Sequence, residues 1–410
     1  MSAPGGSVYS LRRFSSSEMG LALAIVVVIA LTTLLDSNRS YLADPWLSAK
    51  DIVRQTVMLG IFALGSAIVI IAGGIDLSSG SMIAFAGTTC ATIMLVLDPQ
   101  GMQSDHVGTG VVAIAIIGTL LVGFLVGTLH AWLITVVGLP PFVATLATLV
   151  GLRSFGRALV ENVTADVLKA PSTQIQIFDR SFRYLATSLW IPIVIFAVLA
   201  VGSWVLMKHT VVGRHLYALG GNEQAARLSG IRTDRLKWLA YCLSAVFASI
   251  AGILYIGDQS VADPQTLGRG YELNAIAAAV VGGCSLQGGI GTIPGTVLGC
   301  LFLRAVIDGV SKVIKTGADV YEGLVVGIVV VVAVAVSQIR THGAQRKQFF
   351  PGLLGLVIIP TLTVLTGLLA TLMAGQGAGL AATVTALGFM LGVKVLETRA
   401  SRAVPPAEAD

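Results

Sequence analysis

The sequence is poor in charged residues, which make up 11% of its 410 positions. Ordinary soluble domains carry roughly a quarter charged residues, so this deficit excludes a soluble globular protein. Cysteine is also scarce, and Cys90, Cys242, Cys284 and Cys300 each lie inside an apolar stretch, without a CxxC pair or a nearby histidine. We interpret them as buried small apolar side chains rather than as disulfide partners or metal ligands.

Motifs for bond-making chemistry are missing as well. The chain contains no P-loop motif GxxxxGK(S/T), no HExxH and no GxSxG, and its five histidines are scattered without metal-ligand spacing. The sequence therefore predicts no enzyme, no cofactor and no metal site. The formal charge of +5 does not indicate nucleic-acid binding, because the 26 basic residues lie between apolar runs and form no continuous stripe.

Apolar residues and glycine dominate what is present: 55% of the residues are hydrophobic, Gly numbers 47, and the mean hydropathy is +0.86. A membrane-spanning helix needs about 20 apolar residues. We therefore predict an all-α polytopic membrane protein, with about 10 core transmembrane helices, broken or re-entrant segments, and an extra C-terminal helical hairpin. The uncharged runs that predict these spans are 19–35, 55–75, 77–97, 107–152, 184–207, 238–257, 273–303, 323–339 and 348–393.

Three of these runs do not fit a single helix. Run 107–152 must hold two spans, and Leu139-Pro140-Pro141 supplies the break, because proline removes a backbone donor and clashes with the preceding turn. Run 273–303 is long for one helix and short for two, which favours a broken or re-entrant element. Run 348–393 predicts the hairpin, with its turn at Gly375-Gln376-Gly377.

Loop charges predict the orientation. Segment 208–237 carries six Lys or Arg residues against Glu223 and Asp234, whereas segments 98–106 and 258–272 together carry only Arg269. The positive-inside rule places the first segment in the cytoplasm and the other two outside. With an even number of spans, both termini are expected in the cytoplasm.

A short repeat marks two of the apolar stretches. GGIDLSSG at 73–80 and GGCSLQGG at 282–289 share the pattern GGxxLxxG, 209 residues apart. Glycine-broken segments in two halves of a transporter indicate a translocation path, because the unwound backbone offers donors and acceptors to a polar, uncharged solute. The alternative is that the glycines only allow close helix packing. The candidate path residues are Gly73, Gly74, Asp76, Ser78, Ser79, Ser81, Pro140, Pro141, Gly282, Gly283, Ser285, Gly288 and Gly289.

Asp76 has two interpretations. An ionisable residue between apolar runs is a functional candidate by default, but Asp76 could equally cap a helix that begins at Leu77. An ion-coupled secondary transporter is therefore an alternative function, although it would normally place several ionisable residues at membrane depth, where only Asp76 and His130 qualify. A membrane enzyme is a second alternative, and it would need clustered Asp, Glu or His residues that the sequence does not show.

Residues 222–230 predict a short cytoplasmic helix. Asn222 can cap it, Glu223 suits its positive first turn, and Gly230 can supply a left-handed stop. A helix of about two turns is marginal alone in water, so we expect it to dock on a partner through its Ala225-Ala226 face. The alternative is a solvated surface helix.

Five segments together carry a family resemblance: GGIDLSSGS (73–81), LPPFVATL (139–146), GRHLYALGGNEQAARLSGI (213–231), YELNAIAA (271–278) and GGCSLQGGIGTIPG (282–295). Over about residues 55–336 the chain resembles the permease subunits of bacterial ATP-binding-cassette (ABC) importers for monosaccharides, the ribose and xylose type within the branched-chain amino acid permease superfamily. The resemblance implies a sugar path through the inner membrane and ATP hydrolysis on a separate chain.

The resemblance also implies the partners: an ABC ATPase, an extracytoplasmic sugar-binding protein, a second permease (a copy or a paralogue) and membrane lipid, with no nucleic acid. Glu223, Ala225, Ala226 and Gly230 match the ExAAxxxG signature by which such permeases contact their ATPase. The expected coupling residues are Arg214, Gly221, Asn222, Glu223, Ala225, Ala226, Arg227 and Gly230.

The expected organisation has three parts. A cytoplasmic tail (1–18) precedes the permease domain (19–339), which contains the coupling loop 208–237. Residues 340–410 add a linker, the hairpin and a polar tail, which such permeases usually lack, so the role of the hairpin stays open. Segment 161–183 is either a contact for a binding protein or a solvated loop. The sequence names neither the sugar nor the second permease.

Overall fold

The computed structural model describes residues 16–104, 106–314, 322–329, 331, 350 and 352–402. In these ranges the chain is almost entirely helical, and the one strand pair found there is short: β1 (Ile175–Gln176) runs antiparallel to β2 (Val261–Ala262). The predicted all-α fold is therefore confirmed. Contacts divide the chain into two compact units, Met1–Ser337 and Gln338–Asp410.

Nine helices in the described ranges are long and apolar enough to span a bilayer. Their bounds are α1 Ser16–Leu35, α3 Pro45–Ile71, α4 Ser79–Leu97, α6 Thr109–Thr135, α7 Pro141–Leu168, α9 Trp190–His209, α12 Thr233–Gln259, α14 Ile293–Val313 and α17 Gln376–Arg402. The remaining helices are α2 Ser40–Ala43, α5 Pro99–Ser104, α8 Arg180–Thr187, α10 Val211–Gly221, α11 Glu223–Leu228, α13 Tyr271–Val281 and α16 Gly352–Ala374.

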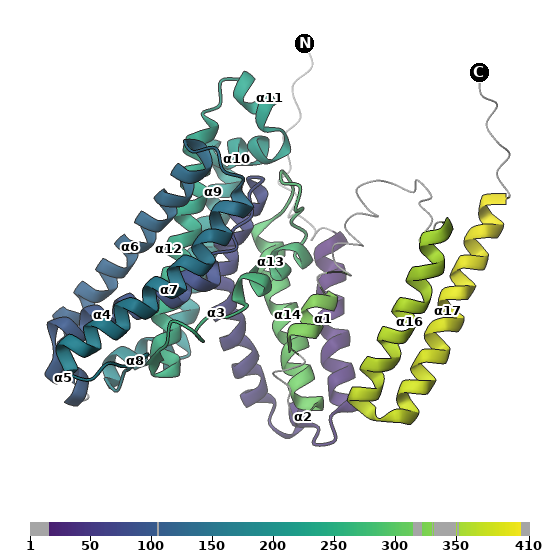
Figure 1. The fold of residues 1–410 in the computed structure, drawn as a ribbon, viewed down its shortest axis with the longest axis horizontal. Helices are drawn as coiled ribbons and strands as arrows, with labels where there is room; N and C mark the ends of the chain where they lie inside the picture. Colours follow the sequence, from purple (N-terminus) through teal and green to yellow (C-terminus); the bar gives the residue numbers. More distant parts are fainter. Residues whose placement is uncertain are drawn as a thin grey trace, which may run out of the picture. The chain divides into compact units, whose positions relative to one another are not determined.

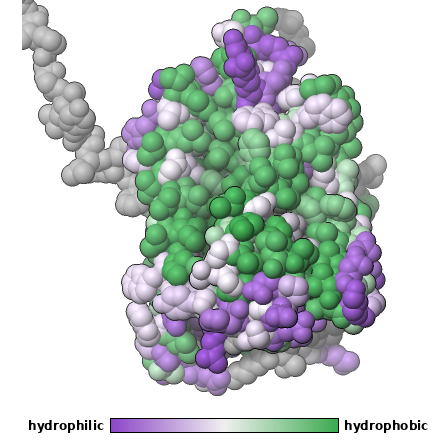
Figure 2. Space-filling model, turned by 90° about the vertical axis from the view of Figure 1, so that its left-hand side faces the viewer, coloured by the Kyte–Doolittle hydropathy of each residue, from purple (hydrophilic) through white to green (hydrophobic). Residues whose placement is uncertain are grey.

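The core of the first unit is formed by α3, α4 and α12, whose side chains are mostly buried on all sides. Helices α6, α7 and α9 pack around this centre and leave large apolar side chains exposed, among them Ile117, Phe155 and Val198. Figure 2 shows a broad hydrophobic band between hydrophilic ends. A folded chain that exposes such a band is suited to lipid rather than to water.

Most short helices of this unit lie at its two ends, whereas α13 lies between them (Figure 1). Helices α10 and α11 lie at one end, and α2, α5 and α8 lie at the opposite end (Figure 1). Helix α11 belongs to the basic segment 208–237. The end that carries α10 and α11 is therefore the one that the loop charges predict to be cytoplasmic.

Two of the three predicted breaks lie in the first unit. The chain turns between α6 and α7 at Pro140-Pro141, with Pro141 as the first residue of α7. The run 273–303 divides into α13 and α14, separated by the glycine-rich loop 282–292, and α14 continues to Val313. A broken element is therefore confirmed here, whereas the helix that follows the break continues past residue 303, where the uncharged run ends.

The segment 161–183 is not one external loop. Residues up to Leu168 continue α7, and α8 begins at Arg180. Helix α7 tolerates charge because the guanidinium of Arg153 donates to the carbonyl oxygens of Leu267 and Gly268, both at 3.0 Å. The sequence cannot show that these carbonyls lie close to Arg153. A charged residue at this position therefore predicted that the membrane helix ends at residue 152.

The second unit is a helical hairpin of α16 and α17, with its turn at Gly375, where φ is +86°. The two helices approach closely because Gly367 faces Thr383 and Gly379 faces Thr371. Small residues at such positions let backbones come together in a membrane. The predicted C-terminal hairpin and its turn are therefore confirmed.

Candidate functional site

The two glycine-broken segments share one backbone geometry. After α3, the amide of Gly73 donates to Ile70 O and that of Gly74 to Val69 O; after α13, Gly283 donates to Val280 O and Cys284 to Ala279 O, all at 2.9 Å. Gly73 and Gly283 have φ of +83° and +96°. Both helices thus end in a Schellman motif, in which a left-handed residue closes the last turn.

This geometry shifts the repeat by one residue. The pattern GGxxLxxG pairs Gly73 with Gly282, but the structure pairs Gly73 with Gly283, 210 residues further along. The physical reason is that the left-handed residue, not the first glycine, defines the end of the helix. The duplication of a helix end is real, although the matching letters do not align it correctly.

Backbone contacts join the two breaks to α10. The amide of Gly289 donates to Ile71 O at 2.9 Å, which satisfies a carbonyl that the end of α3 leaves open. Gly220 of α10 lies against both: a Cβ on Gly220 would contact Ile71 O and would stand 2.6 Å from Gly289 N. A Cβ on Gly288 would stand 2.8 Å from the Cα of Gly73. We call Gly73, Gly220, Gly288 and Gly289 the glycine junction.

A cavity of about 310 Å³ opens beside the glycine junction. Its walls include Gly73, Gly74 and Pro141, which the sequence assigned to the path, and Gly221, Asn222 and Glu223, which it assigned to ATPase coupling. Lys237, Tyr241 and Gln287, none of them predicted, complete the polar part of the lining. Two sets of residues that the sequence kept apart therefore meet at one place.

Asp76 lies in a separate, fully buried cluster and is 2% exposed. Its carboxylate accepts hydrogen bonds from the Ser78 amide at 2.9 Å and hydroxyl at 2.6 Å, and from the Ser244 hydroxyl of α12 at 2.7 Å. Helix α4 begins at Ser79 rather than at Leu77, so Asp76 fixes the turn before the helix and ties it to α12. Asp76 is therefore not the N-cap of α4, as the capping interpretation expected, because Ser78 is the N-cap and Asp76 accepts a hydrogen bond from its amide in the turn that leads into the helix.

Neighbouring side chains satisfy the carbonyl of Ile75, which the break leaves without a helical partner. The hydroxyls of Thr145 (3.3 Å) and Tyr241 (3.4 Å) both point to this oxygen. His130, which is fully buried, pairs its Nε2 with the hydroxyl of Thr148 at 2.7 Å and packs edge-on against Tyr241. His130 is therefore a packed side chain whose Nε2 is hydrogen-bonded.

The other predicted path residues are scattered around these two places. Ser78, Ser79 and Ser81 are buried, with Ser81 donating to Ser78 O at 2.8 Å. Pro140 and Gly283 are exposed, and Gly282 and Ser285 are half-buried. The structure therefore brings Gly73, Gly74, Pro141, Gly288 and Gly289 together near α10, places Asp76 with the three serines in the core, and leaves Pro140, Gly282, Gly283 and Ser285 outside both groups.

The predicted coupling helix is present as α11. The side chain of Asn222 accepts from the Ala225 amide at 2.9 Å, and Gly230 has φ of +81°, as capping and stop residues should. Glu223 accepts from Lys237 of α12 at 2.7 Å and from Arg227 at 3.3 Å, so α11 is anchored to the next helix.

The exposed face of α11 differs from the predicted one. Ala226 is buried against the chain, so the Ala225-Ala226 pair cannot face a partner as a unit. Leu228 is 90% exposed instead. Arg214, Gly221, Ala225, Arg227 and Gly230 are exposed on α10, on α11 and just after it. Leu228 is thus the apolar side chain of α11 that a partner could contact.

Sequence reasoning missed Arg304. It directly follows the uncharged run 273–303 and so looked like the start of a loop, whereas it lies within α14 and is 7% exposed. Asp308 and Lys312 follow at intervals of four residues, and their side chains lie 3.7 Å apart. That spacing was the available signal, because charges four residues apart share one face of a helix.

Comparisons with known proteins agree with one another. Residues 48–334 match the family described as branched-chain amino acid transport system / permease component. The ribose import permease protein of Escherichia coli is 33% identical over 78% of this chain and 93% of the relative. The galactose/methyl galactoside import permease protein of E. coli is 29% identical (79% and 94%), and a probable ABC transporter permease protein of Sinorhizobium fredii is 34% identical (77% and 89%). No solved structure matches the chain.

Proposed function

Because this multi-pass membrane chain belongs to the family of branched-chain amino acid transport system permease components, we propose that it is the permease of an ATP-driven importer that carries a monosaccharide across the bacterial inner membrane. The relatives that are named for ribose and for galactose support a sugar substrate. Ribose, xylose and galactose are the candidates. The chain is a transport subunit, and ATP is hydrolysed on a separate ATPase.

The glycine junction carries this proposal. Only Asn222 separates the coupling helix α11 from α10, and Gly220 of α10 packs against the end of α3 and against Gly288 and Gly289 in the loop before α14. Backbone packed against backbone has little room to yield. A displacement of α11 by the ATPase is therefore passed to α3 and to the loop before α14 together. This coupling supplies the motion that alternating access requires.

The ends of the first unit suggest where the partners bind. The ATPase contacts the α10 and α11 end through Arg214, Gly221, Glu223, Ala225, Arg227 and Gly230, with Leu228 as an added anchor. The sugar-binding protein docks at the opposite end, which carries α2, α5 and α8 (Figure 1). Both termini are cytoplasmic, and a second permease, a copy or a paralogue, completes the path.

The exposure of Leu228 gives a direct test. We expect Leu228→Ser to remove ATPase association and sugar uptake, because a central apolar anchor at an interface contributes about 2 kcal/mol or more, or roughly thirtyfold in affinity. The side chain is 90% exposed in this chain, so the substitution costs little folding stability. The measurement is mild-detergent purification of the permease, quantification of the co-purifying ATPase, and uptake of labelled D-ribose and D-galactose.

Two further variants complete this test. Glu223→Arg should also uncouple uptake, because it breaks the contact with Lys237 and places like charges together. Ser229→Ala is the matched control, since its hydroxyl only bonds back to Ala225 O on the same helix. Normal ATPase recovery with Leu228→Ser would exclude α11 as the docking element.

The C-terminal hairpin gives a separate prediction. Truncation after Lys347 should lower the membrane abundance of the permease several-fold, because it removes both helices of the second unit, and cells degrade membrane chains that have lost part of their folded structure. Gly367→Leu, which separates the two helices where Gly367 meets Thr383, should act in the same direction. Quantitative immunoblotting of membranes and sugar uptake measure both effects. Full abundance and uptake by the shortened chain would show that the hairpin is dispensable.

A further inference from the structure

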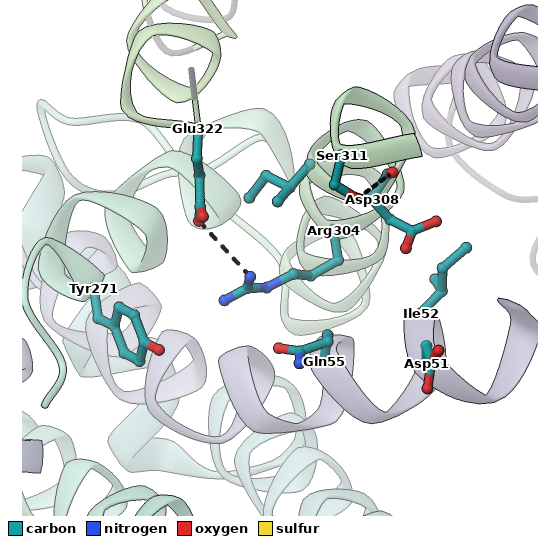
Figure 3. Close-up of a pocket in the computed structure, with 9 residues that line it drawn as sticks. Asp51, Ile52, Gln55, Tyr271, Arg304, Asp308, Ser311 and Glu322 are labelled. Carbon is teal, nitrogen blue, oxygen red and sulfur yellow. Dashed lines mark hydrogen bonds and ion pairs between the residues drawn. The ribbon is translucent and has the colours of Figure 1, made fainter. Parts of the chain in front are cut away.

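A second cavity, of about 330 Å³, lies around Arg304 (Figure 3). Its polar lining comes from three helices and residue 322: Asp51 and Gln55 of α3, Tyr271 of α13, Arg304 and Asp308 of α14, and Glu322. None of the candidate path residues lines it. Its volume falls at the lower end of the range for small-molecule pockets.

Arg304 has an incomplete set of partners. Its side chain is buried, yet Nη1 stands 3.9 Å from the Glu322 carboxylate, beyond hydrogen-bond distance, and Nε has no acceptor among the described residues. Figure 3 shows the guanidinium pointing into the space between Glu322, Gln55 and Tyr271. A buried guanidinium with free donors is costly unless a further group accepts them. The cavity is therefore lined by guanidinium N–H donors that a bound ligand with acceptor oxygens would satisfy.

The cavity lining carries the carboxylates of Asp51, Asp308 and Glu322 together with the guanidinium of Arg304. Glu322 offsets Arg304, and Asp308 is held by the Tyr41 hydroxyl at 2.7 Å and by Lys312 at 3.7 Å. Burial, and then the bond to Asp308, raise the pKa of Tyr41, so its hydroxyl stays protonated and donates. An anion would meet carboxylates here and a cation would meet Arg304. A neutral solute with both donors and acceptors fits this lining best.

One wall of the cavity is aromatic. Tyr271 is stacked on Phe62 at 6.0 Å and packs against Tyr255 at 5.1 Å, so its ring is held in place. Ile52 and Ile307 add apolar surface. A fixed ring beside paired polar groups suits a ring-shaped polyol, whose C–H groups contact the aromatic face while its hydroxyls reach the charged side chains.

We infer that this cavity is a monosaccharide-binding subsite in which Arg304 donates to, and Glu322 accepts from, hydroxyls of one sugar. The inference rests on the proposed function and adds a place where the sugar is held. Helix α14 links this place to the glycine junction, because Ile293 begins the helix just after Gly289, while Arg304 lies eleven residues along, or about 16 Å. Helix α14 thus connects a sugar bound at Arg304 to the glycine-rich loop 282–292, which contacts α10.

Thiol protection tests the subsite independently of transport. Ser311 is exposed and lines the cavity, whereas the four native cysteines are buried, so Ser311→Cys offers one reactive thiol. In membrane vesicles that hold the complete importer, D-ribose, D-xylose or D-galactose should slow the reaction of this thiol with methyl methanethiosulfonate. Raffinose, a trisaccharide that is too large for a cavity of about 330 Å³, should not. Adding Arg304→Leu with Glu322→Leu should weaken protection about tenfold or more, as expected for the loss of charge-assisted hydrogen bonds.

A matched pair controls for the loss of two charges. Arg54 and Asp258 form an ion pair between α3 and α12 and do not line the cavity, so Arg54→Leu with Asp258→Leu should leave protection unchanged. Replacing a purely structural ion pair by apolar residues is often neutral. Wild-type transport and protection in the Arg304 and Glu322 double variant would therefore overturn the subsite.

The remaining outcomes separate the two proposals. ATP-driven uptake of one of the three sugars without any protection of the thiol would overturn the subsite and leave the proposed function standing. No ATP-driven uptake of any of the three by the intact importer would overturn the monosaccharide function itself, and the subsite with it.

Discussion

Replacing Gly220 with alanine is expected to abolish sugar uptake, whereas replacing Gly202 of α9 with alanine is expected to leave uptake near the wild-type rate. Both substitutions add one methyl group to a helix of the first unit. A Cβ on Gly220 would contact the carbonyl oxygen of Ile71 and stand 2.6 Å from the amide of Gly289. A Cβ on Gly202 would meet no described atom within 4 Å.

The difference follows from what the methyl group displaces. At Gly220 the added methyl group meets backbone atoms, which cannot rotate away as a flexible side chain can. It would push apart the Gly289 amide and the Ile71 carbonyl, which are hydrogen-bonded to each other. Overpacking costs typically about 1–3 kcal/mol, so uptake should fall about tenfold or more. Gly202 is not among the glycines with positive φ, and alanine favours a helix over glycine.

The measurement is the initial rate of ATP-driven uptake of labelled D-ribose and D-galactose, normalised to permease in the membrane. ATP hydrolysis by the assembled complex is recorded in parallel. If the junction transmits motion, Gly220→Ala retains hydrolysis and loses uptake. Wild-type uptake by Gly220→Ala, at normal abundance, would show that the glycine junction is not needed for transport.

Asp76→Ala is expected to remove most of the permease from the membrane, whereas Asp76→Asn should retain ATP-driven uptake. Alanine leaves the buried Ser78 amide and the hydroxyls of Ser78 and Ser244 without their acceptor. Each buried group without a partner costs about 1–3 kcal/mol, a large part of the stability of a folded protein. Asparagine can still accept from Ser78 through its oxygen and donate to the Ser244 hydroxyl.

This pair also decides between the two interpretations of Asp76. An ion-coupled transporter needs a carboxyl group that binds and releases a cation, so Asp76→Asn would abolish uptake at normal abundance. The test compares membrane abundance and uptake, with and without ATP, for both variants. Asp263→Ala is the control, because Asp263 accepts the same kinds of bonds from Gln265 and Thr266 in an exposed turn, where water replaces them.

The membrane helices could be predicted because their signal is local. The lengths of the apolar runs, the proline break before Pro141 and the hairpin turn at Gly375 are properties of neighbouring residues, and the structure has each of them. The same holds for α11, whose cap at Asn222 and stop at Gly230 depend only on the chain beside them.

The sites could be predicted only in part. The sequence selected Gly73, Gly288 and Gly289, but it could not show that Gly220 is the residue they contact. It treated Asp76 as an isolated charge, although Ser244 of a distant helix completes its bonds. Aligning the two copies by identical residues also shifted the repeat by one position, because only the hydrogen bonds show that Gly73 corresponds to Gly283.

The sequence by itself thus determined that this protein is an all-helical membrane permease, where its helices break, and where a short capped helix follows the apolar span before it. Only the tertiary structure decided that both breaks meet α10, that Ala226 faces inward while Leu228 faces outward, and that Arg304 lies buried beside a cavity. The physical reason is the distance along the chain over which the deciding interactions act. Hydrophobic length, capping and turns act within a few residues, whereas the packing of glycines and the burial of a charge depend on residues far apart in the chain.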